Sequence, residues 1–280
     1  MGDGALRELA AIAADPERWP SLDEDTLLLL VFQQAFYYAH TQDPEAAAAL
    51  ALLYPHVVSR VPESERLELQ DRVTMSVEEG HVPVSALLPF LQHESSPVAV
   101  ALAAVSFATL MPLEEGDEMT GPRTLVRMAA HADDDGARIG LLSGLLQLGD
   151  RRVLPLLASV WDVLEPESRA AMAALPSPSK LAFAASVEFW LGALEAGEPA
   201  AADALVRIAR EAEPPRVLDV RRKFPAHAAD DRDEISVLDD VSIEGWGARM
   251  APRLAALGEG HVLAARLADV RAAWGIREAR

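Results

Sequence analysis

The sequence predicts an all-α protein built from tandem helical hairpins, and three observations support this class. The chain of 280 residues is 50% hydrophobic but only 5% aromatic. Its apolar side chains are therefore mainly Ala, Leu and Val, of which Ala and Leu favour helices. Proline, glycine and capping residues divide the chain into short helical segments. A stretch of apolar pattern also recurs, without a gap, 38 positions further along, which is typical of repeat architectures.

Three helices are predicted before the repeat. The first covers residues 21–40, because Ser-Leu-Asp-Glu at its start has the pattern of a capping box. The second covers residues 43–54 and opens with Asp-Pro-Glu, where the proline occupies a first-turn position. The third covers residues 62–79 and ends at Gly80.

The repeat consists of residues 86–112 laid over residues 124–150, with His93 falling on His131. Each copy contains a short apolar helix, a polar turn (HESSP or HADDD) and a longer apolar helix. A third, shorter copy over 152–175 is cut by the prolines that follow it, because proline in a helix interior costs about 3 kcal/mol. One hairpin cannot bury both of its apolar faces. The mixture of Leu with Gly, Ala and Ser therefore predicts closely packed neighbours.

Five positions in these copies also match a known pattern: Asp134, Arg138, Gly149, Asp150 and Arg169. The segment resembles HEAT repeats, especially short bacterial ones, whose second helix opens with Asp-Pro-x-Val-Arg and ends in Leu-Gly-Asp. The resemblance implies a right-handed α-solenoid of roughly six or seven hairpins, with a concave face that binds proteins. It also implies that the Arg in the first turn of each second helix, as at Arg138 and Arg169, bonds the turn of a neighbouring unit. On physical grounds alone, Asp134 is expected to cap its helix and Gly149 to end it.

The whole chain, residues 1–280, is predicted to form one domain. Its predicted parts are a diverged N-terminal cap (1–83), HEAT-like repeats (84–211), an irregular segment (212–247) and a C-terminal helical cap (248–280). Beyond the third copy, helices are predicted over 179–196, 199–211, 248–257 and 261–274. The irregular segment has no helical period and carries a basic triplet and an acidic run. It is either a structural linker or a binding loop.

Charge narrows the classes of partner. The net charge is −19, and the resulting field would repel nucleic acid. The stretch 246–280 differs from the rest, because its six arginines face only three carboxylates. The acidic remainder is either an ordinary solvated surface or a docking face for a basic partner. No cysteine is present and no apolar run reaches the roughly 20 residues that span a bilayer, so a cytoplasmic protein without membrane contact is expected.

Catalytic and metal-binding patterns are weak. The pair His93-Glu94 resembles the His-Glu pairs of deoxyhypusine hydroxylase, a HEAT-like iron enzyme, but the matching position in the next copy is Ala132. A metal site would lack ligands, so we expect no metal and no cofactor. Motifs of hydrolases, P-loops and dinucleotide-binding sites are not found in the sequence, so no catalytic residue is predicted.

The sequence therefore predicts a non-catalytic scaffold that binds a protein partner, as a monomer or weak oligomer. A sharper version is an immunity or inhibitor protein for a basic toxin, because strong acidity favours charge-steered association. The alternatives are a HEAT-like enzyme, resembling a DNA glycosylase or a lyase, and a structural subunit of an assembly. The predicted partner-binding residues are Gln147, Arg151, Arg152, Asp230, Asp231, Asp233 and Trp246. Of the tryptophans, Trp246 is the one expected to be exposed.

Overall fold

The computed structural model describes residues 8–9, 11–115, 117–162, 164–180, 182–212, 243–258 and 260–276. These residues form α-helices and short 3-10 helices with no β-strand among them, which confirms the predicted all-α class. Within the same ranges, no helix is long and apolar enough to cross a membrane. The chain divides into two compact units, Met1–Leu145 and Leu146–Arg280, called the N-terminal and C-terminal units below.

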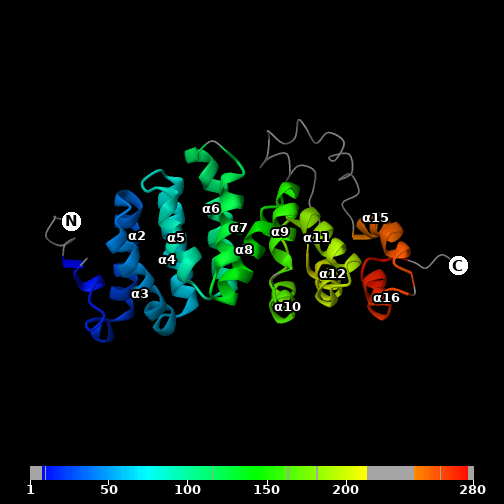
Figure 1. The fold of residues 1–280 in the computed structure, drawn as a ribbon, viewed down its shortest axis with the longest axis horizontal. Coiled ribbons are helices and arrows are strands. Elements are labelled where there is room, and N and C mark those ends of the chain that lie inside the picture. Colours follow the sequence, from blue (N-terminus) through cyan, green and yellow to red (C-terminus); the bar gives the residue numbers. More distant parts are fainter. Residues whose placement is uncertain are drawn as a thin grey trace. The chain divides into compact units, whose positions relative to one another are not determined.

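The N-terminal unit is a succession of antiparallel-type helical hairpins (Figure 1). Its elements are η1 (Trp19–Ser21), α2 (Glu24–Thr41), α3 (Pro44–Arg60), α4 (Glu63–Glu78), η2 (Val84–Leu87), α5 (Leu88–His93), α6 (Pro97–Glu115), α7 (Thr120–His131) and α8 (Asp135–Gln147). The alternate helices α2, α4 and α6 contact one another in that order, and α3 contacts α5 beside them. Helix α4 thus contacts the helices on both sides of it in this series, α2 and α6.

Capping side chains set the helix starts of this unit. Asp23 caps α2 by accepting a hydrogen bond from the Thr26 N–H at 2.8 Å. The predicted capping box at residues 21–24 is therefore wrong, because Ser21 belongs to η1 and its hydroxyl donates to the Arg18 carbonyl. Asp43 caps α3 as predicted, with its side chain accepting from the Glu45 N–H at 2.9 Å.

Helix α3 continues past the predicted end at residue 54 and includes Pro55. A proline lacks the N–H that a helix interior requires and usually ends the helix. Here Leu53, Tyr54 and Val57 are each at most 1% exposed. Burial of these side chains on both sides of the proline offsets the missing hydrogen bond.

The glycines of α8 allow this helix to pack closely on α6. Gly136, Gly140 and Gly144 recur every four residues and so lie on one side of the helix. A Cβ atom at Gly140 would lie 2.5 Å from the Val100 Cβ, and one at Gly144 would lie 2.5 Å from the Ala104 Cβ. Helix α8 therefore packs directly on the backbone of α6. This contact confirms that small residues allow a close approach of neighbouring helices.

The hairpin turn before α8 has the capping geometry predicted for it. The Asp134 carboxylate accepts from the Ala137 N–H at 2.8 Å, and Gly149 ends the segment with a φ of 73°. Arg138 bonds the carbonyls of Ala129 and Ala132, at the end of the helix that precedes its own. The implied bond to a neighbouring unit's turn is therefore wrong for Arg138, which bonds within its own hairpin. Arg169 does bond a following turn, because it donates to Glu198, the residue that caps the helix Pro199–Glu211.

The C-terminal unit is a second set of helices (Figure 1). Its elements are η3 (Arg151–Val153), α9 (Leu154–Trp161), α10 (Pro166–Ala174), α11 (Phe183–Glu195), α12 (Pro199–Glu211), α15 (Ile243–Ala256) and α16 (Ala264–Ala273). Helix α12 contacts α10, α11 and α16, and α15 contacts α16. Helix α12 thus occupies the centre of this unit.

The predicted helix boundaries in this unit are partly right. Helix α12 has the predicted bounds, but α11 begins at Phe183 rather than at 179, because Ser179 acts as a turn residue and accepts from the Ala182 N–H. Helix α15 begins at Ile243, which corrects the predicted irregular segment at its C-terminal end. The rest of that segment, 213–242, lies outside the described residues.

Candidate functional site

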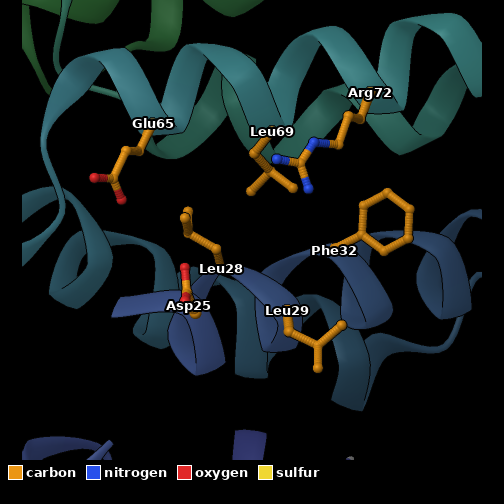
Figure 2. Close-up of a pocket in the computed structure, with 7 residues that line it drawn as sticks. All are labelled: Asp25, Leu28, Leu29, Phe32, Glu65, Leu69 and Arg72. Carbon is orange, nitrogen blue, oxygen red and sulfur yellow. The ribbon is translucent and has the colours of Figure 1, made fainter. Parts of the chain in front are cut away.

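A groove lies between α2 and α4 in the N-terminal unit (Figure 2). It has a volume of about 360 Å³ and is lined by Asp25, Leu28, Leu29, Phe32, Glu65, Leu69 and Arg72. Four of these side chains are apolar and form the floor and walls of the groove. The other three are charged: both carboxylates lie at one end, and the Arg72 guanidinium reaches back beside Leu69.

Helix α2 lines the groove because it is apolar on two sides. Leu27, Leu30 and Val31 are 0% exposed and face the core. Leu28, Leu29 and Phe32 lie on another side and face the groove, where Leu29 remains 44% exposed. The Phe32 ring packs against that of Phe36, with centroids 4.3 Å apart, one turn further along. Leu29 and the part-exposed Leu28 and Phe32 together give this side of α2 an apolar surface.

Helix α4 forms the opposite wall with residues spaced by about one turn. Glu65, Leu69 and Arg72 follow one another along the groove, and Met75, which is 57% exposed, comes next. The other side of α4 is buried, with Arg66 and Val73 among its core residues. Leu69 is only 5% exposed and forms the part of this wall next to the core, whereas Met75 is open to solvent.

The charged side chains of the groove have few partners within the protein. The carboxylates of Asp25 and Glu65 have no hydrogen-bond or ion-pair partner among the residues that the structure describes. Arg72 forms an ion pair with Glu68 at 3.7 Å, but both side chains are about 70% exposed. Exposed pairs of this kind contribute little to stability. The three charged groups are therefore free of strong internal partners that a ligand would have to displace.

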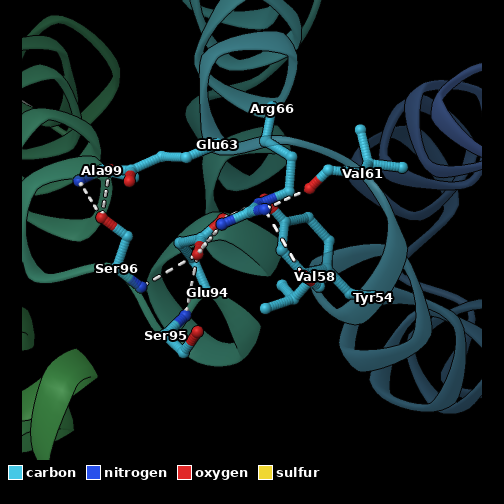
Figure 3. A network of polar contacts seen from close by, with 9 residues as sticks. All are labelled: Tyr54, Val58, Val61, Glu63, Arg66, Glu94, Ser95, Ser96 and Ala99. Atoms are coloured by element: carbon cyan, nitrogen blue, oxygen red, sulfur yellow. Dashed lines mark hydrogen bonds and ion pairs between the residues drawn. The ribbon is translucent and has the colours of Figure 1, made fainter. Parts of the chain in front are cut away.

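A buried polar network holds α4 in place behind the groove (Figure 3). The Arg66 Nε donates to Glu94 Oε2 at 2.8 Å, and a second guanidinium nitrogen donates to Oε1 at 3.0 Å. The backbone N–H groups of Ser95 and Ser96 also donate to Glu94 Oε1, each at 2.9 Å. The network links the first turns of α4 to the α5–α6 turn, so it fixes one wall of the groove.

Burial and charge in this network shift two pKa values. Burial raises the pKa of Tyr54 well above its ordinary value, and the charge of Glu94, to which its hydroxyl donates, raises it further. Burial lowers the pKa of Arg66, but the hydrogen bonds and charge of Glu94 outweigh this effect and raise it overall. Tyr54 therefore stays neutral and Arg66 stays cationic at every physiological pH.

The network also gives Glu94 of the His93-Glu94 pair a structural role. Glu94 is 1% exposed and is engaged by Arg66, and burial lowers the pKa of His93. No group of three or more His, Cys, Asp and Glu side chains gathers in metal-binding geometry within the described ranges. Sequence reasoning did not find this ion pair. The signal was present, because Pro62-Glu-Ser-Glu-Arg66 is similar to Glu165-Pro-Glu-Ser-Arg169.

The predicted partner-binding residues are not brought together at this groove. Arg151 and Arg152 are exposed at the turn before α9, where Arg152 forms an ion pair with Asp150 at 2.6 Å. Gln147, beside them, accepts a hydrogen bond from the Ser179 N–H at 3.1 Å. Asp230, Asp231 and Asp233 lie outside the described residues. A partner-binding role for these positions stays a prediction.

The predicted exposure of Trp246 is wrong, because this residue is only 6% exposed. Its ring packs edge-on against Phe183 at 5.4 Å, and the Arg249 guanidinium lies 5.0 Å from the ring centroid. Close packing explains the burial: a Cβ atom at the adjacent Gly247 would lie 2.0 Å from the Trp274 carbonyl oxygen. The glycines that flank Trp246 in the sequence allow helix contact rather than a loop.

The groove of the N-terminal unit was missed at the sequence level. A signal existed in α2, where apolar residues occur at nearly every position between Leu27 and Phe36 and exceed what one core face requires.

Comparison of the chain with protein-family models, with curated proteins and with solved structures finds no match. A function for this protein is therefore inferred from its own residues.

Proposed function

We propose that this protein is a non-catalytic interaction module that binds a basic protein through its N-terminal unit. The observation that carries the proposal is the joint presence of a strong negative charge and exposed apolar side chains on that unit. It contains 23 Asp and Glu against eight Arg and no Lys, a net charge of −15. The same unit contains the apolar groove between α2 and α4.

Helix packing supports an α-solenoid as the framework of this module. In the N-terminal unit α4 contacts α2 and α6, and in the C-terminal unit α12 contacts α10 and α16. Contacts between alternate helices are expected when hairpins similar to HEAT repeats stack on one another. Such a stack leaves one face of each second helix available for a partner.

Exposed apolar residues occur on three successive alternate helices of the N-terminal unit. Leu29 of α2, Met75 of α4 and Leu102 of α6 are 44%, 57% and 51% exposed. Single exposed apolar residues are ordinary on protein surfaces. We propose that these three residues, one on each of three neighbouring helices, belong to one binding face.

The charge identifies the kind of partner. A surface dominated by carboxylates attracts a basic protein over long range and accelerates its association, and salt screens this attraction. The toxin-inhibitor version predicted from the sequence fits the same physics, because fast charge-steered capture suits neutralisation of a basic enzyme.

The proposal is tested by affinity capture from the native cell with the full chain as bait. The captured protein is then purified and its association rate measured across a series of NaCl concentrations. We expect a basic protein whose association rate falls about tenfold or more from low to high salt. Recovery of small molecules alone, an acidic partner, or a rate insensitive to salt would contradict the proposal.

A matched pair of triple variants places the effect on the N-terminal unit. Neutralising exposed Glu24, Asp71 and Glu78 is expected to slow association. Neutralising Glu165, Glu167 and Asp269 of the C-terminal unit removes the same number of exposed charges and is expected to slow it less. An equal effect of the two sets would assign binding to the whole surface rather than to this unit.

A further inference from the structure

We infer that the α2–α4 groove binds a single amphipathic helix of the partner, with its apolar face against Leu28, Leu29, Phe32 and Leu69. The cationic end of this helix lies over Asp25 and Glu65, and an acidic residue further along it pairs with Arg72 beside Leu69. This inference rests on the proposed function, because it names the segment of a basic partner that enters the site.

The dimensions of the groove match a short stretch of helix. Glu65 and Arg72 are seven residues apart on α4, a separation of about 10 Å at a rise of about 1.5 Å per residue. The volume of about 360 Å³ is enough for a few side chains and too small for a folded element. An occupant helix therefore inserts apolar residues at positions i, i+3 or i+4, and i+7, while its backbone stays above the groove.

The charges along the groove determine the direction of the occupant. The Asp25 and Glu65 side chains lie at one end without an internal partner in the described chain, so a Lys or Arg of the occupant gains two carboxylates there. Further along the groove, Arg72 pairs with the exposed Glu68. A carboxylate of the occupant can join this pair without breaking a buried interaction.

The groove is preformed, which favours a defined occupant. Its α4 wall is anchored by the buried pair of Arg66 and Glu94, with exposed side-chain fractions of 8% and 1%. Its α2 wall is anchored by packing against α3. A rigid site loses little conformational freedom on binding, so the spacing of apolar residues in the occupant is expected to matter.

The experiment uses the full chain and a fluorescein-labelled synthetic peptide of about 14 residues, or four helical turns. The probe has two Lys at one end, two Glu at the other, and Leu at i, i+3, i+4 and i+7. A second peptide has the same composition with its Leu residues spread around the helix. We expect fluorescence anisotropy to show binding of the first peptide and at least about fivefold weaker binding of the second. Equal binding of both peptides would overturn the inference.

Two matched pairs of variants locate the peptide on the protein. Leu29→Ser is expected to weaken binding about fivefold or more, whereas Leu52→Ser changes a 61% exposed leucine on α3 outside the groove and has no effect. Asp25→Asn is expected to weaken binding, whereas Asp71→Asn on the exposed side of α4 is not. All four positions are exposed, and circular dichroism melts verify that each variant remains folded. Equal losses within a pair would contradict the assigned site.

The same variants separate failure of this inference from failure of the proposed function. If the captured basic partner binds with a salt-dependent rate but is indifferent to Leu29→Ser and Asp25→Asn, the proposed function stands and the groove assignment falls. If no basic partner is found, the proposed function itself falls. A dimer seen by light scattering that Leu29→Ser dissociates would show that a second copy occupies the groove, and would overturn the inference.

Discussion

Both units of this protein are built from helices, but they differ in net charge and in how their charged side chains are paired. The N-terminal unit has a net charge of −15, whereas the C-terminal unit has 17 Lys and Arg against 21 Asp and Glu, a net charge of −4. In the C-terminal unit arginines connect separate helices. Arg253 bonds Glu188 and Glu195 of α11 at 2.7 and 2.6 Å, and Arg266 pairs with Asp203 of α12.

The N-terminal unit cannot pair its carboxylates in the same way. Eight arginines serve 23 acidic side chains, so at least 15 carboxylates have no arginine of their own within the unit. The comparison teaches that one unit uses its charges mainly to connect helices, while the other leaves an excess on its surface. An excess of like charge opposes compactness, but it also attracts a partner of opposite charge.

The largest expected effect comes from the buried pair of the N-terminal unit. Glu94→Gln leaves the Arg66 cation buried without a counter-charge, and we expect a loss of about 3–5 kcal/mol in the free energy of unfolding. Urea denaturation followed by far-ultraviolet circular dichroism measures it.

The corresponding pair of the C-terminal unit provides the comparison. Arg169 and Glu198, 2.9 Å apart, are more exposed, at 22% and 10% of their side chains. Water can solvate the remaining charge, so Glu198→Gln is expected to cost about 1 kcal/mol. Equal losses at Glu94 and Glu198 would show that burial does not distinguish the two units in this way.

A second comparison concerns glycines in the helices of each unit. Gly140→Ala in α8 places a Cβ atom 2.5 Å from Val100 Cβ and 2.7 Å from the Pro97 carbonyl oxygen. We expect a loss of about 1–3 kcal/mol, because α6 and α8 must separate. Gly192→Ala in α11 meets nothing within 4 Å and is expected to stabilise by about 0.5–1 kcal/mol. Thermal unfolding of the two variants measures both, and the same sign for both would refute the packing argument.

The smallest expected effect is the helix cap at Asp23. Hydrogen bonding by Thr26, from its hydroxyl and then from its backbone N–H, lowers the pKa of Asp23 below 3.8. A lowered folded-state pKa means that the cap stabilises above the unfolded-state pKa and is lost as the pH falls through the folded-state value. Asp23→Ala should therefore lower the melting temperature slightly at neutral pH, and the difference should shrink below about pH 4. A difference that grows on acidification would contradict this sign.

Sequence reasoning performed best where local chemistry decides the structure. The cap at Asp134, the left-handed Gly149 and the bounds of α12 were all predicted, because each depends on residues within one turn. It failed at Pro55, where burial of neighbouring side chains keeps a helix intact across a proline. It failed again at Trp246, whose flanking glycines indicated a loop but allow a close contact with Trp274.

The candidate site shows the same division. The apolar excess of α2 and the charge excess of the N-terminal half can be counted in the sequence, yet their coincidence at one groove cannot. Asp25 and Glu65 are 40 residues apart along the chain and meet only because α2 and α4 lie side by side. The similarity between the sequences around Arg66 and Arg169 could also be recognised in the sequence. The burial of Glu94 could not.

By itself, then, the sequence determined the helical class, most helix ends and the acidity of the N-terminal half. These depend on propensity, capping and composition, which are properties of single residues and their close neighbours. Only the tertiary structure decided which carboxylates form ion pairs with buried arginines, and which side of α2 remains exposed to solvent. Those outcomes depend on contacts between distant segments, and a helix that is apolar on two sides does not reveal which side its neighbours will cover.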